Sequence, residues 1–420
     1  MKKIHNFNQF LNFYCKKYNE KIYYLGENEQ KQISFSELLL IIKKFNYFLK
    51  KKVKSNSRIL VLLDNSRALL IIFLSILYGF RIFIPVNPKS SKDEIDYIIK
   101  KSKPNFFIVD KDLKKKVSKI YKRKILFINH NNFIEKIKKI KIFENEKVIL
   151  NKKQSVAQIL FTSGSTGSPK GVVLTHESMI TNIFDIQNCL KLENDNPRFM
   201  SVTPLYHNNG QFIPTLLPLI LGGSTISISP DTSLINFWPI SKKFRINYSS
   251  VMATHINYFN KLVPVKNHSI KSLFCGGAKL DKNSQKTFEK KFNIKILCNY
   301  GLTETSSIAA TETLNKKKFF YGSVGKRLDN NQIKFVNKIG KYGEIWIKGN
   351  NIFKEYLGEK KLTNLKFSKK WFKTGDLGYQ NSKGYIFIKD RIDNMIIVSG
   401  ENIYPTEIEN LLSKFKKITL

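Results

Sequence analysis

The chain has 420 residues, of which 42% are apolar, and it carries a formal net charge of +40. This length exceeds what one ordinary hydrophobic core serves, so we expect a globular protein of two or more domains. Polar residues such as Asn6 and Asn12 interrupt the N-terminal apolar stretch, which argues against an export signal. The longest apolar run, residues 68–80, is too short to cross a bilayer; it predicts a buried helix and no transmembrane segment.

The basic composition raises the question of nucleic-acid binding. Only eight of the 72 basic residues are arginines, although the reading of base edges relies on arginine, and the lysine runs lie far apart. We therefore expect no specific nucleic-acid partner, although a lysine coat would attract polyanions such as nucleotides and acidic carriers. Cys15, Cys189, Cys275 and Cys298 lack metal-ligand spacing and the density of a disulfide scaffold, which favours reduced thiols and a cytoplasmic location.

Strand-like and helix-like segments alternate from residue 58 to about residue 301. Helices are predicted over 68–78 and from residue 92, where Ser91 and Glu94 form a capping-box pattern. This alternation predicts an α/β fold with largely parallel sheets. From about Gly322 short strands alternate with glycine-containing turns, which predicts a small β-rich subdomain over 322–392 within a large domain of residues 1–392. The predicted strands are 58–63, 81–86, 105–110, 124–128, 156–162, 224–229, 272–277, 294–301, 332–336, 343–349 and 384–390.

Residues 161–171 read FTSGSTGSPKG and follow a predicted strand. Glycines let backbone N–H groups surround an anion, hydroxyl side chains add donors, and Lys170 adds a mobile positive charge, so the segment predicts a phosphate-binding loop. It is not a Walker loop, because the GK[ST] ending is missing. The alternative is a flexible Gly/Ser surface loop, which would leave the ordered threonine, proline and lysine positions unexplained.

Six segments in order resemble the adenylate-forming superfamily, which includes acyl- and aryl-CoA synthetases, nonribosomal peptide adenylation domains and firefly-type luciferases. The resemblance covers nearly the whole chain, and the last segment is most similar to fatty-acyl and related CoA ligases. The family implies a large N-terminal adenylate-forming domain of layered, mostly parallel sheets with helices, followed by an α+β lid domain. The segments are TSGSTGSPKG (162–171), PLYHNNG (204–210), CGGAKL (275–280), NYGLTET (299–305), WFKTGDLG (371–378) and DRIDNMIIVSGENIYPTEIE (390–409).

The resemblance implies that ATP and Mg²⁺ bind this chain. Thr303 would hydrogen-bond the α-phosphate and Glu304 would hold the Mg²⁺; in isolation these residues read as a helix-capping threonine and a solvated glutamate. Catalytic roles are implied for Thr303, Glu304, His207 and Lys170. The implied nucleotide-binding residues are Thr162, Ser163, Gly164, Ser165, Thr166, Gly167, Lys170, Gly276, Gly277, Ala278, Asn299, Tyr300, Gly301, Thr303, Asp376 and Arg391.

For three of these residues, the sequence is also consistent with a purely structural role. The resemblance implies that Tyr300 stacks on adenine, although a buried core tyrosine looks identical in a sequence. It implies that Asp376 accepts hydrogen bonds from both ribose hydroxyls, although an aspartate between glycine turns is common. Arg391 would contact ribose or phosphate, where the alternative is a surface salt bridge.

The same resemblance places the acyl pocket beside PLYHNNG and VMATHINYF (251–259). His207 would lie where the acyl carboxylate approaches, although a lone histidine is usually structural. Amino-acid-activating relatives have an aspartate in this region, and PLYHNNGQF has none, which favours a carboxylic acid without an α-amine. The expected pocket residues are His207, Asn208, Met252, Gly276 and Gly301.

The C-terminal segment raises a difficulty. Asp393 corresponds to the family's hinge, Asn394 departs from the acidic residue common there, and 27 residues follow Asp393 in this sequence. The family's lid is a domain of roughly a hundred residues, so we expect 393–420 to be a hinge and a stub of a truncated lid. Thr406 and Glu409 form a capping-box pattern before an amphipathic helix, which would dock back, be covered by another polypeptide, or belong to a broken gene product.

These observations predict an ATP-dependent acid–thiol ligase that makes acyl-AMP and passes the acyl group to CoA. Alternatives are transfer to the phosphopantetheine of a carrier protein and a nucleotide- or acyl-binding remnant with little catalysis. A separate lid or an acyl carrier protein would then be a partner beside the carboxylic acid, ATP and CoA. A basic nucleic-acid-binding protein is the remaining class, and salt-sensitive binding to random duplex would favour it.

Overall fold

The structure of the chain is a computed structural model. It describes residues 4–26, 31–117, 124–130, 132–142, 154–162, 169–192, 196–229, 233–314, 320–394, 396–398 and 401–403.

Among the described residues, seven strands form one sheet in the order β18-β8-β7-β4-β3-β5-β6. The strands from β4 to β6 in this order run parallel, as does the β4–β7 pair, whereas β8 and β18 are antiparallel to their neighbours. Both faces of β3, β4 and β5 are buried, as expected for parallel strands covered by helices. The bounds are β3 (Arg58–Leu62), β4 (Ile82–Val86), β5 (Phe106–Asp110), β6 (Ile125–Ile128), β7 (Val156–Thr162), β8 (Lys170–Thr175) and β18 (Glu355–Tyr356).

A second sheet has nine strands in the described part of the chain, in the order β15-β14-β13-β12-β11-β9-β10-β1-β2. Its centre, from β13 to β1, is parallel, and β2, β14 and β15 are antiparallel. The bounds are β1 (Ile22–Tyr24), β2 (Ile33–Ser34), β9 (Arg198–Ser201), β10 (Ser224–Ser227), β11 (Tyr248–Val251), β12 (Ser272–Cys275), β13 (Lys295–Tyr300), β14 (Ala310–Thr311) and β15 (Lys326–Arg327). Two such sheets with helices confirm the predicted α/β class.

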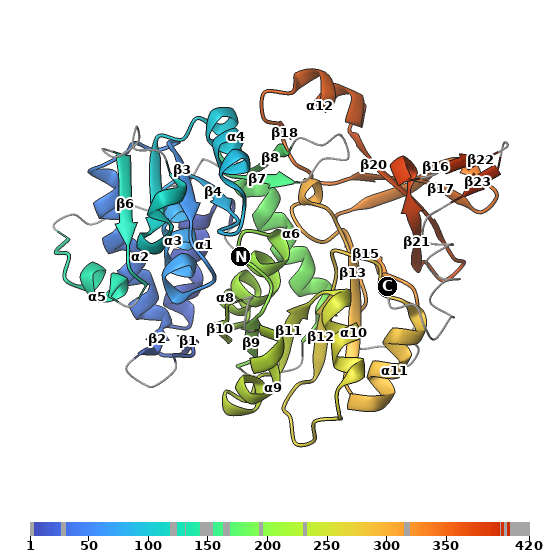
Figure 1. Cartoon of the computed structure of the whole chain (residues 1–420), viewed down its shortest axis with the longest axis horizontal. Coiled ribbons are helices and arrows are strands. Elements are labelled where there is room, and N and C mark those ends of the chain that lie inside the picture. Colours follow the sequence, from blue (N-terminus) through green and yellow to red (C-terminus); the bar gives the residue numbers. More distant parts are fainter. Residues whose placement is uncertain are drawn as a thin grey trace.

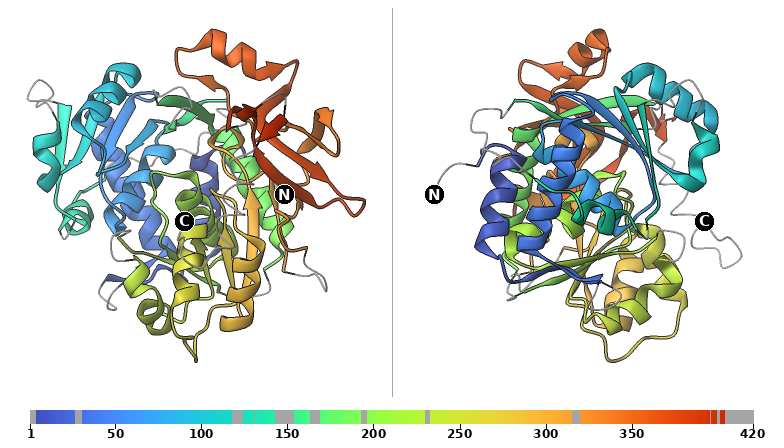
Figure 2. Two further views of the ribbon diagram at one scale, coloured as in Figure 1. Left: turned by 45° about the vertical axis from the view of Figure 1, so that its right-hand side comes forward. Right: turned by 90° about the vertical axis from the view of Figure 1, so that its left-hand side faces the viewer.

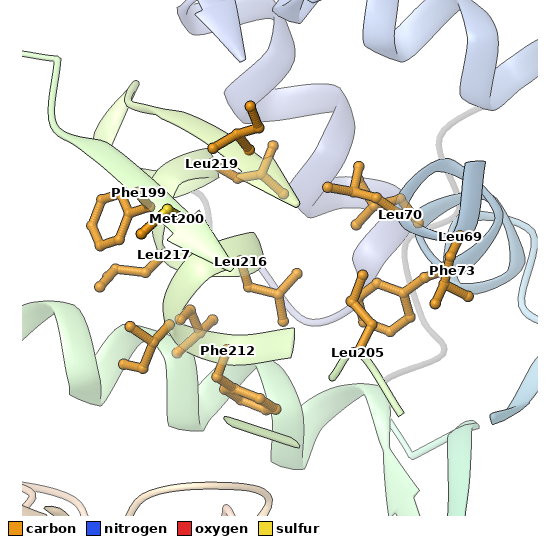
Figure 3. Close-up of a cluster of buried hydrophobic side chains, with 14 of the residues drawn as sticks. Leu69, Leu70, Phe73, Phe199, Met200, Leu205, Phe212, Leu216, Leu217 and Leu219 are labelled. Atoms are coloured by element: carbon orange, nitrogen blue, oxygen red, sulfur yellow. The ribbon is translucent and has the colours of Figure 1, made fainter. Parts of the chain in front are cut away.

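Helices between the two sheets join them into one hydrophobic core (Figures 1 and 2). The central one, α3 (Arg67–Tyr78), is buried from Ala68 to Tyr78, which confirms the buried helix predicted there. Figure 3 shows its side chains Leu69, Leu70 and Phe73 on one side of the core and Phe212, Leu216 and Leu217 on the other. The neighbouring helices are α1 (Phe7–Lys17), α2 (Phe35–Lys50), α5 (Phe133–Lys138), α6 (His176–Leu190), α7 (Asn208–Gln211), a π-helix over Phe212–Leu216 and α8 (Leu217–Leu221).

Other helices cover the outer faces of the sheets. The first of them, α4 (Lys92–Ser102), is capped by Ser91, whose hydroxyl accepts a hydrogen bond from the Glu94 backbone N–H at 3.2 Å. It packs on the opposite face of the seven-stranded sheet from α3. Three further helices lie on the nine-stranded sheet (Figure 1): α9 (Ser233–Lys243), α10 (Ala253–Lys261) and α11 (Lys282–Phe292). Elsewhere in the chain, short 3₁₀ helices span Lys111–Lys116, Thr303–Thr305 and Ile392–Asn394.

A third, antiparallel sheet forms the β-rich part after Gly322, drawn in red in Figure 1. Two strands from this stretch pair elsewhere: β15 joins the nine-stranded sheet and β18 joins the seven-stranded sheet. The β-rich part is therefore tied to both larger sheets. Its elements are β16 (Gln332–Ile339), β17 (Tyr342–Lys348), α12 (Lys360–Lys366), β19 (Phe367–Ser368), β20 (Trp371–Gln380) and β21 (Ile386–Arg391), followed by the hairpin of β22 (Ile396–Val398) and β23 (Glu401–Ile403).

The amphipathic helix predicted from Thr406 lies outside the described residues. Within the described ranges, no helix combines the length and apolarity that a membrane span requires.

Candidate active site

Three cavities meet where β12 and β13 end, and all three are lined by Gly277, Gly301 and Leu302. Their volumes are about 650, 380 and 350 Å³. We call them, in this order, the phosphate cavity, the ribose cavity and the acyl cavity, after the ligand groups that the sequence analysis predicts for their residues. Every sequence-predicted site residue that the structure describes lines at least one of them.

Glycines at the strand ends let the backbone approach the cavities closely. A Cβ added at Gly301 would lie 1.7 Å from the Ser307 carbonyl oxygen, and one added at Gly276 would lie 2.1 Å from Asn299 Oδ1. No side chain is tolerated at these two positions without rearrangement. The carboxyl ends of parallel strands are also where open α/β sheets bind ligands.

The phosphate cavity begins at the end of the β7–β8 hairpin. Thr162 and Lys170 are the last paired residues of that hairpin, and both line the cavity. Ser163, Gly164, Ser165, Thr166 and Gly167, the middle of the predicted phosphate loop, lie outside the described residues, so their role stays a prediction. Lys366 of α12 and Arg391 of β21 add further positive charge to the same cavity.

Glu304 lies in the 3₁₀ helix Thr303–Thr305 at the wall of the phosphate cavity. Its Oε1 accepts a hydrogen bond from the Tyr356 hydroxyl at 2.7 Å. Burial, followed by the charge of Glu304, raises the pKa of Tyr356, so this hydroxyl stays a donor at neutral pH. The carboxylate is thus oriented by a tyrosine from a different sheet.

The side chains at the wall of the phosphate cavity indicate how Mg²⁺ could bind there. Among the described residues, no group of three or more His, Cys, Asp and Glu side chains is placed to hold a metal ion. Mg²⁺ is often bound through one or two carboxylates together with substrate phosphates and water. Glu304 beside a phosphate cavity fits that mode.

Asp376 lines the ribose cavity, where protein groups already contact both of its oxygens. Its Oδ2 accepts a hydrogen bond from the Tyr300 hydroxyl at 2.6 Å, and its Oδ1 lies 3.3 Å from Arg391 Nη1. Burial raises the pKa of Asp376 above its ordinary value, although the Arg391 charge and the Tyr300 hydrogen bond oppose this shift. A carboxylate has about four acceptor positions, so ribose hydroxyls can still be accommodated.

The acyl cavity is bounded by the turn that carries His207 and by the start of α10. His207, Asn208 and Met252 all line it, as predicted from the sequence. Burial lowers the pKa of His207, so its imidazole is neutral at physiological pH. Two residues of the lining, Asn208 and Asn299, have a buried amide nitrogen (Nδ2) without a hydrogen-bond partner in the protein. Buried donors of this kind normally have an acceptor.

Comparison with known proteins identifies the family. A profile of the AMP-binding enzyme family matches residues 12–357. The chain belongs to this family. It is 25% identical over 95% of its length to the peroxisomal OPC-8:0-CoA ligase 1 of Arabidopsis thaliana, of which the match covers 77%. It is 32% identical over 61% of its length to the sulfoacetate–CoA ligase of Cupriavidus necator and 30% identical over 62% to the 2-succinylbenzoate–CoA ligase of Listeria monocytogenes, spanning about half of each.

Solved structures agree on the fold of this AMP-binding enzyme. O-succinylbenzoate CoA synthetase from Bacillus subtilis in complex with its acyl-adenylate intermediate superposes with a TM-score of 0.84 at 24% identity, covering 97% of this chain and 82% of that one. ATP-bound MatB from Rhodopseudomonas palustris gives a TM-score of 0.86 at 22% identity, covering 98% and 84%. These structures confirm the fold, and the family profile over residues 12–357 confirms the predicted recognition of the superfamily.

Sequence reasoning missed several residues of the phosphate cavity of this AMP-binding enzyme. Tyr356 lies in a two-residue strand outside the six segments, and Lys366 is one lysine among many in a lysine-rich chain. Tyr206 and Thr374 also line the cavity and lie inside the quoted segments, but nothing in their spacing separated them from structural neighbours. Asp393, the predicted hinge, lines the cavity too, and its Oδ2 lies 3.9 Å from Arg391 Nη2.

Proposed function

We propose that this chain activates a carboxylic acid with MgATP, forming acyl-AMP and pyrophosphate, and then transfers the acyl group to the thiol of CoA. The observation that carries the proposal is the meeting of three cavities at Gly277, Gly301 and Leu302. The phosphate cavity is lined by several cationic side chains, and the ribose cavity by the carboxylate of Asp376, which could accept hydrogen bonds from ribose hydroxyls. The acyl cavity is lined by residues with unpartnered amide donors. An adenylate-forming reaction needs these three environments at one point.

The adenylation step joins two anions, because an oxygen of the substrate carboxylate attacks the α-phosphorus and pyrophosphate leaves. Lys170, Lys366 and Arg391 offset the charge of the phosphates, which is the main contribution that a site can make to phosphoryl and nucleotidyl transfer. Thr303 would donate its hydroxyl to the α-phosphate. Glu304 would hold Mg²⁺, which when bound neutralises phosphate charge, and Tyr356 keeps that carboxylate oriented.

The acid is proposed to lack an α-ammonium group. No carboxylate stands among the described residues that line the acyl cavity, so nothing there would pair with an ammonium ion. The amide donors of Asn208 and Asn299 would instead bind oxygen atoms of the substrate. In the second step the thiol sulfur forms a bond to the acyl carbon, the carbonyl carbon–phosphate oxygen bond breaks, and AMP leaves.

The acceptor thiol is proposed to be CoA because the three relatives described above, each matched over at least half of its length, are named CoA ligases. The phosphopantetheine of a carrier protein presents the same thiol and is the alternative acceptor. Parallel thioester assays with CoA and with a loaded carrier protein distinguish the two.

Acid-dependent exchange of pyrophosphate into ATP, measured with a panel of carboxylic acids, tests the first step. We expect at least one acid without an α-amine to support exchange, and Thr303→Ala combined with Glu304→Ala to abolish Mg²⁺-dependent ATP binding. Glu355→Gln, which removes an exposed carboxylate next to Tyr356, is the matched control. ATP binding without exchange for any acid would favour the binding remnant, and unchanged ATP affinity in the double variant would refute the site assignment.

A further inference from the structure

Away from the catalytic cleft, a serine, a histidine and an aspartate form a chain of contacts at one end of the seven-stranded sheet. Ser66 follows β3, Asp110 is the last residue of β5, and His130 follows β6. Because β3, β5 and β6 are parallel neighbours, the three residues come together at the carboxyl ends of their strands. No role assigned above uses any of them.

The two ring nitrogens of His130 connect the other two side chains. His130 Nε2 pairs with Asp110 Oδ2, and His130 Nδ1 lies 3.0 Å from Ser66 Oγ. When Nε2 of the neutral ring carries the proton that faces Asp110, Nδ1 has a lone pair and can accept the proton of the Ser66 hydroxyl. A serine bonded to a histidine that a carboxylate orients is the arrangement of an activated nucleophile.

Ser66 is also the N-cap residue of α3. Its Oγ accepts a hydrogen bond from the Leu69 N–H at 3.1 Å, and its single proton can also face the Asp64 carbonyl oxygen, 3.1 Å away. The cap fixes the position of Oγ and uses one lone pair, which leaves the second for attack on a carbonyl carbon. Arg67 and Ala68 begin α3, so their N–H groups have no partner inside the helix and could stabilise an oxyanion.

Ser66 and His130 both line a cavity of about 550 Å³ that shares no lining residue with the three cavities of the catalytic cleft. The His130 side chain is 30% exposed, so a substrate could reach the ring. Asp110 is buried and does not line this cavity, so its carboxylate supports the ring from the protein interior. The nucleophile and its base are therefore open to a ligand, and the orienting carboxylate is not.

The rest of this lining indicates a substrate with a negative charge. Lys31, Arg67 and Lys243 line the cavity, whereas no carboxylate does so in the described part of the chain. Arg67 Nη1 donates a hydrogen bond to the Lys31 carbonyl oxygen at 2.8 Å, which holds the guanidinium at the cavity wall. Ile240 and Phe244 line the same cavity and would contact a short carbon chain.

We propose that Ser66, His130 and Asp110 form a second active site, which hydrolyses carboxylic esters whose acyl part carries an anionic group. Ser66 Oγ bonds to the carbonyl carbon as its proton moves to His130 Nδ1, and the alcohol leaves with that proton. Water then attacks the acyl-serine and gives a proton to Nδ1, and Ser66 Oγ takes this proton as the acid is released. Asp110 stabilises the imidazolium in both steps. This inference does not depend on the proposed ligase function.

Hydrolysis of para-nitrophenyl hemisuccinate, an activated ester with a free carboxylate, tests the proposal. Ser66→Asn is the decisive variant, because asparagine also caps helices but has no nucleophilic hydroxyl. We expect kcat to fall about a hundredfold or more in Ser66→Asn and in His130→Gln. Ser91→Asn, the same change at the N-cap of α4, is the matched control and should hydrolyse the ester like the native protein. Pyrophosphate exchange should be unchanged in all three variants.

Labelling with a fluorophosphonate tests whether the Ser66 hydroxyl is activated. Its Oγ would bond to phosphorus, fluoride would leave, and His130 would take the proton. Peptide mass spectrometry should locate the adduct on Ser66 in the native protein, and His130→Gln should slow labelling about a hundredfold. If thermal unfolding shows that Ser66→Asn does not fold, His130→Gln carries both comparisons.

Lys243→Gln tests the substrate class. We expect the KM for the hemisuccinate to rise about tenfold, since one charge-assisted contact is lost, and the KM for neutral para-nitrophenyl butyrate to stay the same. An unchanged KM for the hemisuccinate would overturn the anionic class. Hydrolysis in folded Ser66→Asn and His130→Gln at the rate of Ser91→Asn, or no adduct on Ser66, would overturn the second active site and leave Ser66 as a helix cap.

Discussion

Two tyrosine hydroxyls hold the two carboxylates on which nucleotide binding is proposed to depend. Tyr356 donates to Glu304, and Tyr300 donates to Asp376. Each pair joins residues from different parts of the chain, 52 and 76 positions apart. At the scale of single residues, the site is therefore preorganised by hydrogen bonds that no local sequence pattern encodes.

Tyr356→Phe removes only the hydroxyl that orients Glu304. We expect the Mg²⁺ concentration needed for half-maximal exchange to rise about threefold to tenfold, since one hydrogen bond to a charged group is lost. Titration of exchange activity with Mg²⁺ measures this shift. Tyr342→Phe, on β17 away from the cavities, is the control. An unchanged Mg²⁺ dependence would show that Tyr356 does not position Glu304.

Asp376→Asn should change the stability of the protein and its affinity for ATP in opposite directions. The pKa of Asp376 is raised by burial, so ionisation of this group costs folding free energy, and that cost grows as pH rises above the ordinary carboxyl value. The amide should therefore raise the melting temperature at pH 7.5. It should also weaken ATP binding about tenfold, since a charged acceptor is lost. A lower melting temperature together with weaker binding would indicate that the ion pair with Arg391 outweighs desolvation.

At the scale of elements, α6 carries a buried carboxylate that no predicted function uses. Asp185 is 1% exposed, Asn330 donates to its Oδ1, and its Oδ2 has no partner in the protein. Burial raises the pKa of Asp185 to about 6. The helix therefore contributes an acid-sensitive contact to the packing of the β-rich part.

Asp185→Asn should stabilise the protein at neutral pH. Because the folded-state pKa is raised, the native protein is favoured when Asp185 is protonated, and that contribution is lost as pH rises from about 4 to about 6, by roughly 3 kcal/mol at most. The amide removes this loss but leaves its NH₂ group, with two N–H donors, unpartnered, so we expect a net gain of only about 1 kcal/mol at pH 7.5. Denaturant unfolding at pH 4.5 and 7.5 measures it. Asp96→Asn, at an exposed aspartate of α4, is the control, and an equal gain there would contradict the assignment.

At the scale of the whole molecule, three sheets converge on one point. The nine-stranded sheet supplies Gly277, Gly301 and Glu304 just after β12 and β13, the seven-stranded sheet supplies Thr162, Lys170 and Tyr356, and the antiparallel sheet supplies Asp376 and Arg391. The pairing of β18 with β8 ties these parts together. The cleft exists only when all three sheets are docked.

The net charge of +40 also acts on the molecule as a whole. Self-repulsion among lysines opposes compaction, and salt screens it over a length of about 10 Å at 0.1 M ionic strength. We therefore expect the melting temperature to rise between 50 and about 300 mM KCl, while the KM for MgATP rises because attraction of the anion is screened. Scanning fluorimetry and exchange kinetics at both salt concentrations test this, and a melting temperature that falls with KCl would contradict it.

The sequence by itself determined the α/β class, and it predicted many of the residues that line the three cavities. Buried strands such as 156–162 and the helix over 68–78 are predicted correctly because each is marked by a run of apolar residues within one short stretch of sequence. The order of six segments placed Thr303, Glu304 and Asp376 in one family's pattern. Short or partly polar strands such as β9 and β11 carry too weak a periodicity and were not predicted.

Only the tertiary structure decided which distant side chains complete the site. Tyr356 and Lys366 reach the phosphate cavity because sheet pairing and helix packing bring separate segments together. In a chain with 72 basic residues, no single lysine or arginine is distinguished by composition. Local pattern fixes secondary structure, whereas the neighbours of a side chain across a cavity depend on how the sheets dock, and that is a property of the folded chain as a whole.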